Sequence, residues 1–236
     1  MNVRITMANE RGSASYDWLK AGYSFSFAEY FDPMRERFGV LRVLNEDVIS
    51  GGGGFGMHPH NNLEIITMVL SGALEHKDSS GHSTVIHADE IQYMSAGTGV
   101  EHTEKNYHEN LPVHLLQIWI FPKTRNTQPR YDQLTLKKEK QRNTIHTVVS
   151  PDGGDEVIQI NQDAWLSLLD SDREKKYTYS NRLTGNGIYI FVIGGKIEFA
   201  GNTLGSCDAA AITGTDQIEF TALEETSLLI IEVPED

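Results

Sequence analysis

The feature that most constrains the fold is a series of short, strand-like segments separated by turn residues. Runs rich in Val, Ile, Leu, Phe and Tyr alternate with clusters of Gly, Asn, Asp and Ser. This spacing is typical of β-sandwiches and small β-barrels. We predict strands at residues 39–45, 63–70, 83–88, 90–96, 113–121, 188–193, 196–200, 208–213, 217–222 and 227–233. Segment 29–37 lacks a strand pattern, and segment 159–170 fits either a short helix or a strand.

The second half of the chain repeats the pattern of the first half. The stretches 68–75 (MVLSGALE) and 191–198 (FVIGGKIE) each place a strand, a Gly turn and a second strand in order. An Asp-led strand and a closing strand then follow in both halves, so that Gly72 matches Gly195 and Asp89 matches Asp208. Such self-similarity indicates two copies of one structural unit. We therefore predict an all-β chain made of two tandem β-barrels.

The polar stretch between the two copies marks the expected domain boundary. Residues 123–146 are rich in Lys, Arg, Gln and Asn and have no apolar periodicity, as expected for a surface linker. We predict an N-terminal domain at 1–122, a linker at 123–146 and a C-terminal domain at 147–236.

Charge and composition exclude several classes of partner. The formal net charge of -13 disfavours contact with nucleic acid and with anionic membranes. No run approaches the roughly 20 apolar residues of a membrane span, and the first residues do not resemble a signal peptide. The one cysteine, Cys207, lies among small and apolar residues and is expected to be a core residue rather than a nucleophile. We expect a cytoplasmic monomer.

The distribution of histidines confines any histidine-based metal site to the N-terminal domain. The chain has nine histidines, and none follows His146. His58 and His60 flank a proline, and side chains two residues apart in an extended segment point to the same face. Both imidazoles are therefore candidates to point into one barrel. The alternative is a pair of surface histidines at the end of a loop.

A second pair of ligand types strengthens the metal hypothesis. His102 and Glu104 are also two residues apart, and they follow a glycine-rich turn. Three imidazoles and a carboxylate suit Fe, Mn, Ni, Cu or Zn and leave coordination positions open for catalysis. Glu64 competes with Glu104 for the carboxylate role, because it lies four residues beyond His60 and therefore, by parity, on the same face of the strand. A further alternative is that both carboxylates point inward, with one of them behind the metal ligands.

Other residues receive weaker predictions. Strand parity suggests an apolar pocket around the metal, lined by Phe55, Met57, Met68, Met94 and Ile118. Surface positions are expected for His76, His82 and His87, which surround a polar turn. His114 begins an apolar strand and is expected to be hydrogen-bonded near the site.

Residues 54–104 closely resemble the pirin family of the cupin superfamily. The resemblance rests on HPH at 58–60, LEIIT at 63–67, the G-x-x-x-H-x-D-S-x-G pattern at 72–81, and AGTG-x-x-H-x-E at 96–104. It implies a bicupin, two tandem jelly-roll-like barrels, with a metal only in the N-terminal one. The implied cofactor is one divalent transition metal, with Fe expected first and Mn, Co, Ni, Cu or Zn as alternatives. The implied ligands are His58, His60, His102 and Glu104.

The resemblance also implies a function. Bacterial pirin-like proteins are associated with quercetin 2,3-dioxygenase activity, so we expect an oxidoreductase that opens the ring of a flavonol-like substrate with dioxygen. Glu104 is expected to act as the general base. The alternative is a metal-binding regulatory or redox-sensing protein without turnover, which eukaryotic pirins resemble.

Overall fold

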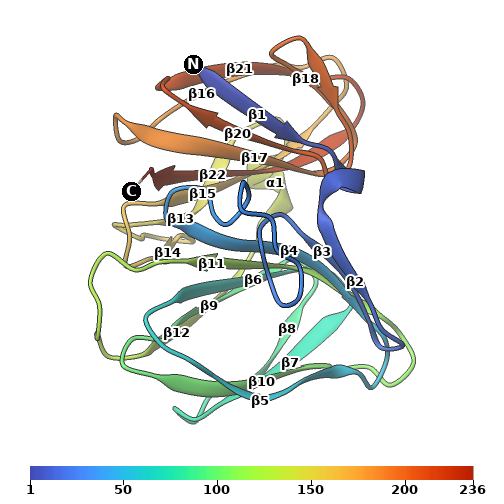
Figure 1. The fold of residues 1–236 in the computed structure, drawn as a ribbon, viewed down its shortest axis with the longest axis vertical. Coiled ribbons are helices and arrows are strands. Elements are labelled where there is room, and N and C mark those ends of the chain that lie inside the picture. Colours follow the sequence, from blue (N-terminus) through green and yellow to red (C-terminus); the bar gives the residue numbers. More distant parts are fainter. Residues whose placement is uncertain (236) are drawn as a thin grey trace.

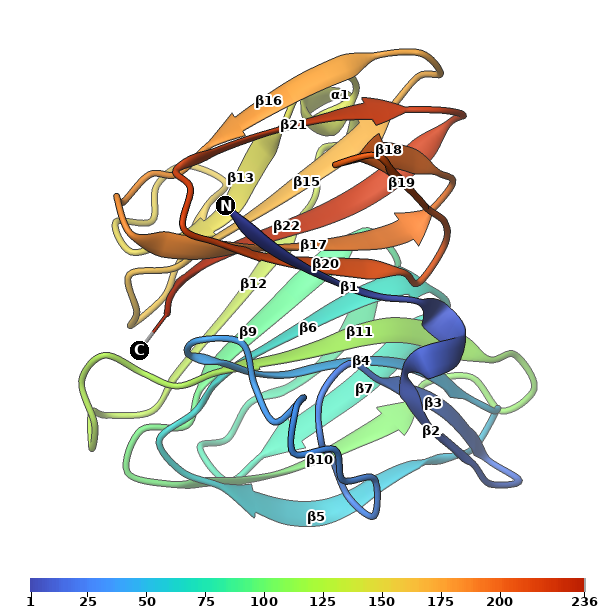
Figure 2. The same cartoon turned by 45° about the horizontal axis from the view of Figure 1, so that its top comes forward.

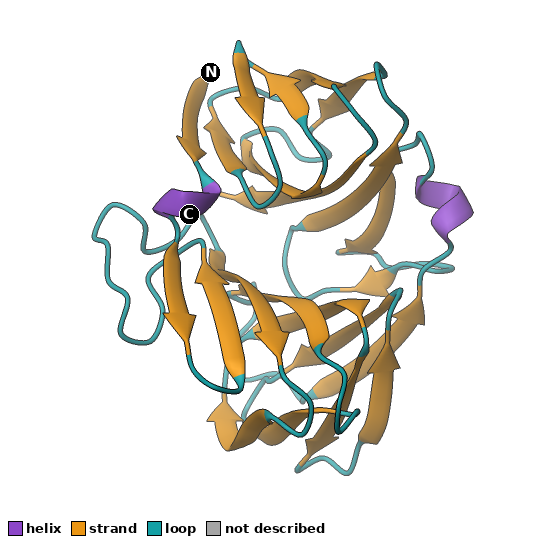
Figure 3. Ribbon diagram, turned by 90° about the vertical axis from the view of Figure 1, so that its right-hand side faces the viewer, coloured by secondary structure: helices purple, strands orange, loops and turns teal. Residues whose placement is uncertain are grey.

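Two β-barrels, one above the other, make up the protein in the computed structural model, which describes residues 1–235 (Figure 1). Each barrel combines a seven-stranded sheet with a four-stranded sheet. The predicted all-β architecture of two tandem barrels is therefore confirmed. The helices that the structure describes are a 3-10 turn at Ala8–Glu10 and α1 at Lys138–Gln141, both at the margins of the sheets (Figure 3). Within these residues, neither helix is long enough to cross a membrane.

The N-terminal barrel is built mainly from the first half of the chain. Its seven-stranded sheet contains, in spatial order, β12 (Arg130–Thr135), β9 (Glu90–Ser95), β6 (Glu64–Ser71), β11 (Val113–Ile120), β4 (Leu41–Ile49), β3 (Leu19–Tyr23) and β2 (Gly12–Ser15). Its four-stranded sheet contains β5 (Gly54–His60), β10 (Val100–Asn106), β7 (Ala73–Asp78) and β8 (Ser83–His87).

The C-terminal barrel has the same two-sheet design. Its seven-stranded sheet contains β1 (Asn2–Thr6), β20 (Ala209–Thr213), β17 (Asn186–Gly194), β22 (Thr226–Pro234), β15 (Trp165–Ser171), β13 (His146–Ser150) and β14 (Ile158–Gln159). Its four-stranded sheet contains β16 (Lys176–Ser180), β21 (Gln217–Ala222), β18 (Ile197–Phe199) and β19 (Asn202–Leu204).

The two seven-stranded sheets pack against each other and form the central core (Figure 1). Alternate residues of a central strand therefore enter different cores. In β17, Tyr189 and Phe191 join the central core, while Ile188 and Ile190 fill the C-terminal barrel. Burial on both faces explains why these strands read as continuous apolar runs rather than as alternating patterns. This matters for the site, because only one face of β4, β6 and β11 points into the N-terminal barrel.

Every strand predicted from the sequence overlaps a strand of the structure. The ambiguous segment 159–170 forms an extended stretch that runs into β15, and segment 29–37 has no named helix or strand. Two parts of the predicted domain division are wrong. β1 pairs with β20 and so belongs to the C-terminal barrel (Figure 2). Its residues Val3 and Ile5 pack on the core of that barrel.

The predicted linker is also more than a linker. Its residues Arg130–Thr135 form β12, which pairs antiparallel with β9 at the edge of the N-terminal sheet. An edge strand is less buried than a central strand and tolerates polar side chains. Residues 130–135 therefore lack the apolar run that would identify a strand in the sequence.

The internal repeat is confirmed at the backbone, with one correction. Gly72 and Gly195 both adopt left-handed conformations, with φ of 82° and 84°. The Asp89 amide donates to the Val69 carbonyl, and the Cys207 amide donates to the Val192 carbonyl. Asp89 and Cys207 also share φ of 65°. The structural counterpart of Asp89 is therefore Cys207, one residue before the predicted match, Asp208.

Candidate metal centre

Two adjacent strands of the N-terminal barrel bring three of the predicted histidines together. His58 on β5 lies directly opposite His102 on β10 in the antiparallel ladder. Their ring centroids are 4.3 Å apart, and His60 lies 4.9 Å from each of them. Nitrogen atoms of all three rings lie within 4.8 Å of one another. Because β5 pairs with β10, the two short motifs become one cluster.

Glu104 lies beside this cluster on β10. The ladder shifts register between His102 and Glu104, a local irregularity that re-aims side chains. Glu104 is 4% exposed, and one of its carboxylate oxygens lies within 4.8 Å of ligand atoms of both His102 and His76. Gln117 Nε2 donates to both Glu104 oxygens at 3.0 Å. The Thr67 hydroxyl lies 3.3 Å from one of these oxygens and donates at 2.9 Å to Gln117 Oε1, which fixes the Gln117 amide. These donors hold the carboxylate in a fixed orientation.

The ring nitrogens are arranged to receive a metal. His102 Nε2 is buried and has no hydrogen-bond partner among the described residues. His58 Nδ1 donates to the Gly56 carbonyl at 2.8 Å, which leaves its Nε2 as a lone-pair donor. Three imidazoles with an adjacent carboxylate are a donor set suited to a divalent transition metal. The residues present therefore fit such an ion.

Burial keeps His60 and His102 neutral at physiological pH. Desolvation, together with the neighbouring His102 and His58, lowers the pKa of His60 to about 4. Desolvation, with His58 and His76 nearby, lowers the pKa of His102 to about 3. A metal must compete with protons for imidazole nitrogens, so low pKa values favour metal uptake near pH 7.

A chain of hydrogen bonds behind His102 was not predicted from the sequence. His76 Nε2 lies 3.1 Å from the Asp78 carboxylate, and its Nδ1 lies 3.4 Å from His102 Nδ1. The carboxylate accepts, so His76 presents an Nδ1 lone pair to the Nδ1 proton of His102. His76 is fully buried, so its predicted surface position is wrong. The signal was the H-x-D spacing within the family pattern; His82 and His87 are exposed as expected.

Glu64 does not approach the metal centre. It begins β6 on the face turned toward the C-terminal barrel and is fully buried. Its carboxylate accepts hydrogen bonds from Tyr93, from Ser95 and from the Asn161 amide of the other barrel. The parity count from His60 was wrong because the intervening turn contains Asn62 in a left-handed conformation and leads into a different sheet.

An aromatic cavity of about 470 Å³ opens next to His58 and Glu104. Phe55 and Met57 line it as predicted. The sequence did not indicate the remaining lining, namely Trp18, Leu19, Tyr23, Phe27, Asn45, Asp47, Gly54, Gly56, Gln117 and Trp119. Trp119 also packs edge-on against His60, with ring centroids 4.8 Å apart.

The other predicted lining residues lie elsewhere. Met68 and Ile118 are in the central core between the barrels. Met94 packs with Ile65 and Val100 in a small separate cluster. Alternation along the strands could not locate these residues because β6, β9 and β11 are buried on both faces.

Asp47 is an ionisable group within this cavity. Burial, reinforced by the nearby charge of Glu104, raises the pKa of Asp47 to about 7.

His114 and Cys207 contact Glu46, the neighbour of Asp47 on the opposite face of β4, at 3.0 Å and 3.3 Å. His114 is therefore hydrogen-bonded as expected, but not at the metal centre. Burial beside Glu46 raises the pKa of the Cys207 thiol to about 12, consistent with an inert cysteine.

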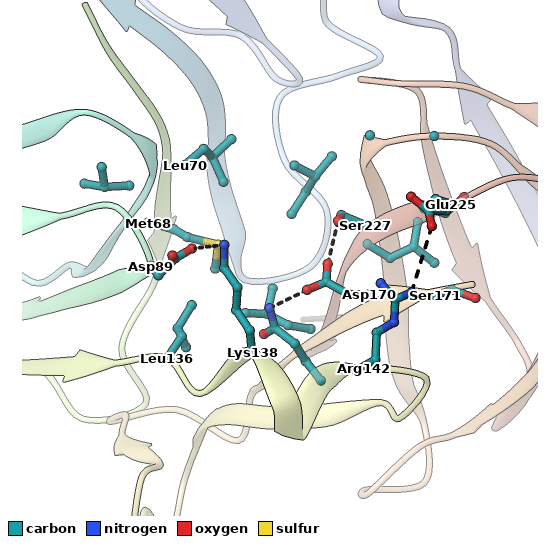
Figure 4. Close-up of a pocket in the computed structure, with 18 residues that line it drawn as sticks. Met68, Leu70, Asp89, Leu136, Lys138, Arg142, Asp170, Ser171, Glu225 and Ser227 are labelled. Carbon is teal, nitrogen blue, oxygen red and sulfur yellow. Dashed lines mark hydrogen bonds and ion pairs between the residues drawn. The ribbon is translucent and has the colours of Figure 1, made fainter. Parts of the chain in front are cut away.

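A second cavity, also about 470 Å³, lies between the barrels beside α1 (Figure 4). Its charged groups pair with one another. Lys138 contacts Asp89 at 2.9 Å, and Asp170 accepts from Gln141 at 2.7 Å and from Ser227. Among its lining residues there is no histidine. The first cavity is therefore the candidate functional site.

Comparison with known proteins agrees with the two-barrel fold. The Pirin family model matches residues 4–120, and the model for the quercetinase C-terminal cupin domain matches residues 147–233. A protein named quercetin 2,3-dioxygenase from Escherichia coli K12 is 36% identical, over 98% of this chain and 99% of its own.

Solved structures place the chain in the same group. The bacterial pirin YhhW from Escherichia coli, in complex with nickel(II), aligns with a TM-score of 0.94 at 35% identity over the whole of both chains. A quercetin 2,3-dioxygenase from Acinetobacter baumannii, at 18% identity over 99% of this chain and 80% of its own, shares the fold with a TM-score of 0.77. The chain belongs to the pirin family of two-barrel cupin proteins.

Proposed function

We propose that this protein is a metal-dependent dioxygenase that opens the ring of quercetin or a similar flavonol. The proposed metal ligands are His58, His60, His102 and Glu104. The observation that carries the proposal is the aromatic cavity that opens on His58 and Glu104. Aromatic walls suit a flat ring system, and polar groups at one end fix its orientation. The names of the relatives point to the same chemistry.

The chain supplies positioning and a proton acceptor. When bound, the metal acts as a Lewis acid that makes a nearby hydroxyl more acidic. Glu104 accepts the proton of the substrate 3-hydroxyl and thus serves as general base. Gln117 keeps both Glu104 oxygens in place. The two atoms of dioxygen then enter the product, and one ring carbon leaves as carbon monoxide.

We propose iron as the resident metal. The donor set admits several divalent ions, and metal availability decides among them as much as ligand type does. Nickel is the ion named for YhhW, so nickel is the first alternative. Metal analysis of the purified protein tests this choice.

The test combines metal content with turnover. The protein is loaded with Fe, Mn, Co, Ni or Cu, and quercetin loss and carbon monoxide release are measured in air. We expect turnover with at least one metal, and His102→Ala should lose both the metal and the activity. His87→Ala removes an exposed histidine outside the cluster and should retain both.

Two outcomes would contradict the proposal. A His102→Ala protein with full activity would exclude the metal mechanism. Absence of turnover with every metal would leave a regulatory or redox-sensing role for the same metal centre.

A further inference from the structure

Two polar side chains form a patch on the wall of the aromatic cavity. Asn45 and Asp47 occupy alternate positions of β4, and therefore project from the same face of the strand. Both line the cavity, yet they are only 3% and 5% exposed. The Oδ1 atom of each has no hydrogen-bond partner among the described residues. We call Asn45 and Asp47 the polar patch.

Unpaired oxygens in such a place need a physical reason. A buried polar atom without a partner costs about 1–3 kcal/mol, and most buried polar atoms in folded proteins are paired. Apolar residues on β4 would fill the same space without that cost. The polar patch is thus explained if a ligand supplies the missing hydrogen-bond donors.

The polar patch is separate from the metal centre. Neither of its residues belongs to the groups whose ligand atoms converge within 4.8 Å. Gln117 lies opposite Asn45 in the ladder, but its amide is directed to Glu104. A ligand held at Glu104 therefore reaches the polar patch with a different part of its surface.

We propose that the polar patch binds phenolic hydroxyls of the substrate other than the hydroxyl that reacts at the metal centre. This inference rests on the proposed function. The ligand class is a flat aromatic molecule carrying several hydroxyls. A carboxyl group retains an acceptor oxygen in either protonation state, and the Asn45 amide oxygen is a second acceptor. Trp18, Phe55 and Trp119 supply apolar walls for the rings.

The experiment measures binding rather than turnover. Nickel-loaded protein is titrated by calorimetry under anaerobic conditions with quercetin and with 3-hydroxyflavone, which has only the reacting hydroxyl. Wild-type protein should bind quercetin about tenfold more tightly, the effect of one additional net hydrogen bond. Asp47→Leu should abolish this preference, so that the ratio of the two affinities falls to about one.

Controls separate the polar patch from general effects. Asp17→Leu removes an exposed carboxylate next to the cavity residue Trp18 and should retain the tenfold preference. Asp47→Asn keeps the shape and one acceptor oxygen, and should give an intermediate preference if Asp47→Leu does not fold. Nickel content is measured for each variant and should equal that of wild type.

The outcomes distinguish the inference from the proposed function. Equal affinity of wild type for both flavonols, or a preference that survives in the Asp47 variants, would overturn the role of the polar patch and leave the dioxygenase proposal intact. Failure of both flavonols to bind wild type would overturn both. Loss of nickel from the Asp47 variants would assign Asp47 to the metal centre instead.

Discussion

At the scale of single residues, the metal centre depends on side chains that are not among its proposed ligands. Asp78 accepts from His76, and His76 in turn accepts from His102 Nδ1 in the arrangement derived above. This chain selects the tautomer in which His102 Nε2 carries the lone pair. Partners of this kind orient metal-binding imidazoles and increase their basicity. The orientation of His102 is therefore prepared before a metal binds.

Asp47 should make the stability of the metal-free protein depend on pH. Its folded pKa of about 7 lies above the ordinary value of 3.8, so the folded state holds a proton that the unfolded state has released. The stability associated with this proton is present below about pH 4 and is lost as pH rises through 7. Asp47→Asn removes this dependence. Relative to wild type, the variant should gain roughly 2–4 kcal/mol in the free energy of unfolding between pH 4.5 and 8.

Urea unfolding of both proteins at several pH values measures this difference. A stability difference that stays constant across the range would show that Asp47 does not titrate as described.

The sequence predicted the positions of the metal-centre residues better than it predicted their surroundings. His58 and His60 lie two residues apart on one strand, so their side chains point to the same face as the sequence predicted. His76 was missed because a buried histidine and a surface histidine look alike in a polar stretch. Glu64 was misjudged because a single left-handed residue, Asn62, ends the count of alternating faces.

At the scale of elements, the repeat depends on tight turns between paired strands. Gly72 and Gly195 occupy the same place in the two barrels, at φ values that L-residues avoid. A Cβ on Gly72 would lie 2.6 Å from the Pro112 carbonyl oxygen, and a Cβ on Gly195 would meet the Glu225 carbonyl. In both barrels the glycine of the turn lies in close contact with the backbone of another segment. This shared restriction explains why the glycines were recognisable in the sequence.

Gly195→Ala should therefore destabilise the protein by roughly 2–4 kcal/mol, because the left-handed conformation and the backbone clash both penalise a methyl group. Gly194 is a matched control at the preceding position. It has no positive φ, and a Cβ there would have no atom within 4 Å. Gly194→Ala should change stability by less than about 1 kcal/mol. Thermal unfolding of the two variants tests the pair, and similar losses in both would contradict the assignment.

The strands themselves were predictable because their apolar runs are short and are bounded by turn residues. The direction of individual side chains was not. Met68 and Ile118 lie on strands that bury both faces. Their polar neighbours Thr67 and Gln117 are buried inside the barrel rather than exposed, so polarity does not reveal which face turns inward. β12 escaped prediction for the opposite reason, since an edge strand with polar residues resembles a loop.

At the scale of the whole molecule, the largest apolar core lies between the barrels rather than inside either one. It includes residues of both seven-stranded sheets, such as Ile66 and Leu116 from the N-terminal sheet and Phe191 and Leu229 from the C-terminal sheet. A barrel separated from its partner would expose this face to water, at a cost of about 25 cal/mol per Å² of apolar surface. The two barrels should therefore depend on each other for stability.

This dependence predicts a single unfolding transition. Trp18 and Trp119 report on the N-terminal barrel, and Trp165 on β15 reports on the C-terminal barrel. Trp165→Phe and the double variant Trp18→Phe/Trp119→Phe isolate the two signals. Fluorescence of each, followed against urea in metal-free protein, should give the same midpoint and match the loss of far-ultraviolet circular dichroism. Two separated midpoints would show that the barrels unfold independently.

The pairing of β1 with β20 has a consequence for the order of assembly during synthesis. Asn2 lies opposite Thr213 in the ladder, so a strand made early must wait for one made some 200 residues later. At roughly 5–20 residues per second, the ribosome takes about 10–40 s to supply the partner. The metal-binding barrel can close in that interval, whereas the second barrel gains its edge strand only by recruiting a segment already made. The pairing of β1 with β20 therefore joins two neighbouring strands of one sheet whose syntheses lie some 200 residues apart.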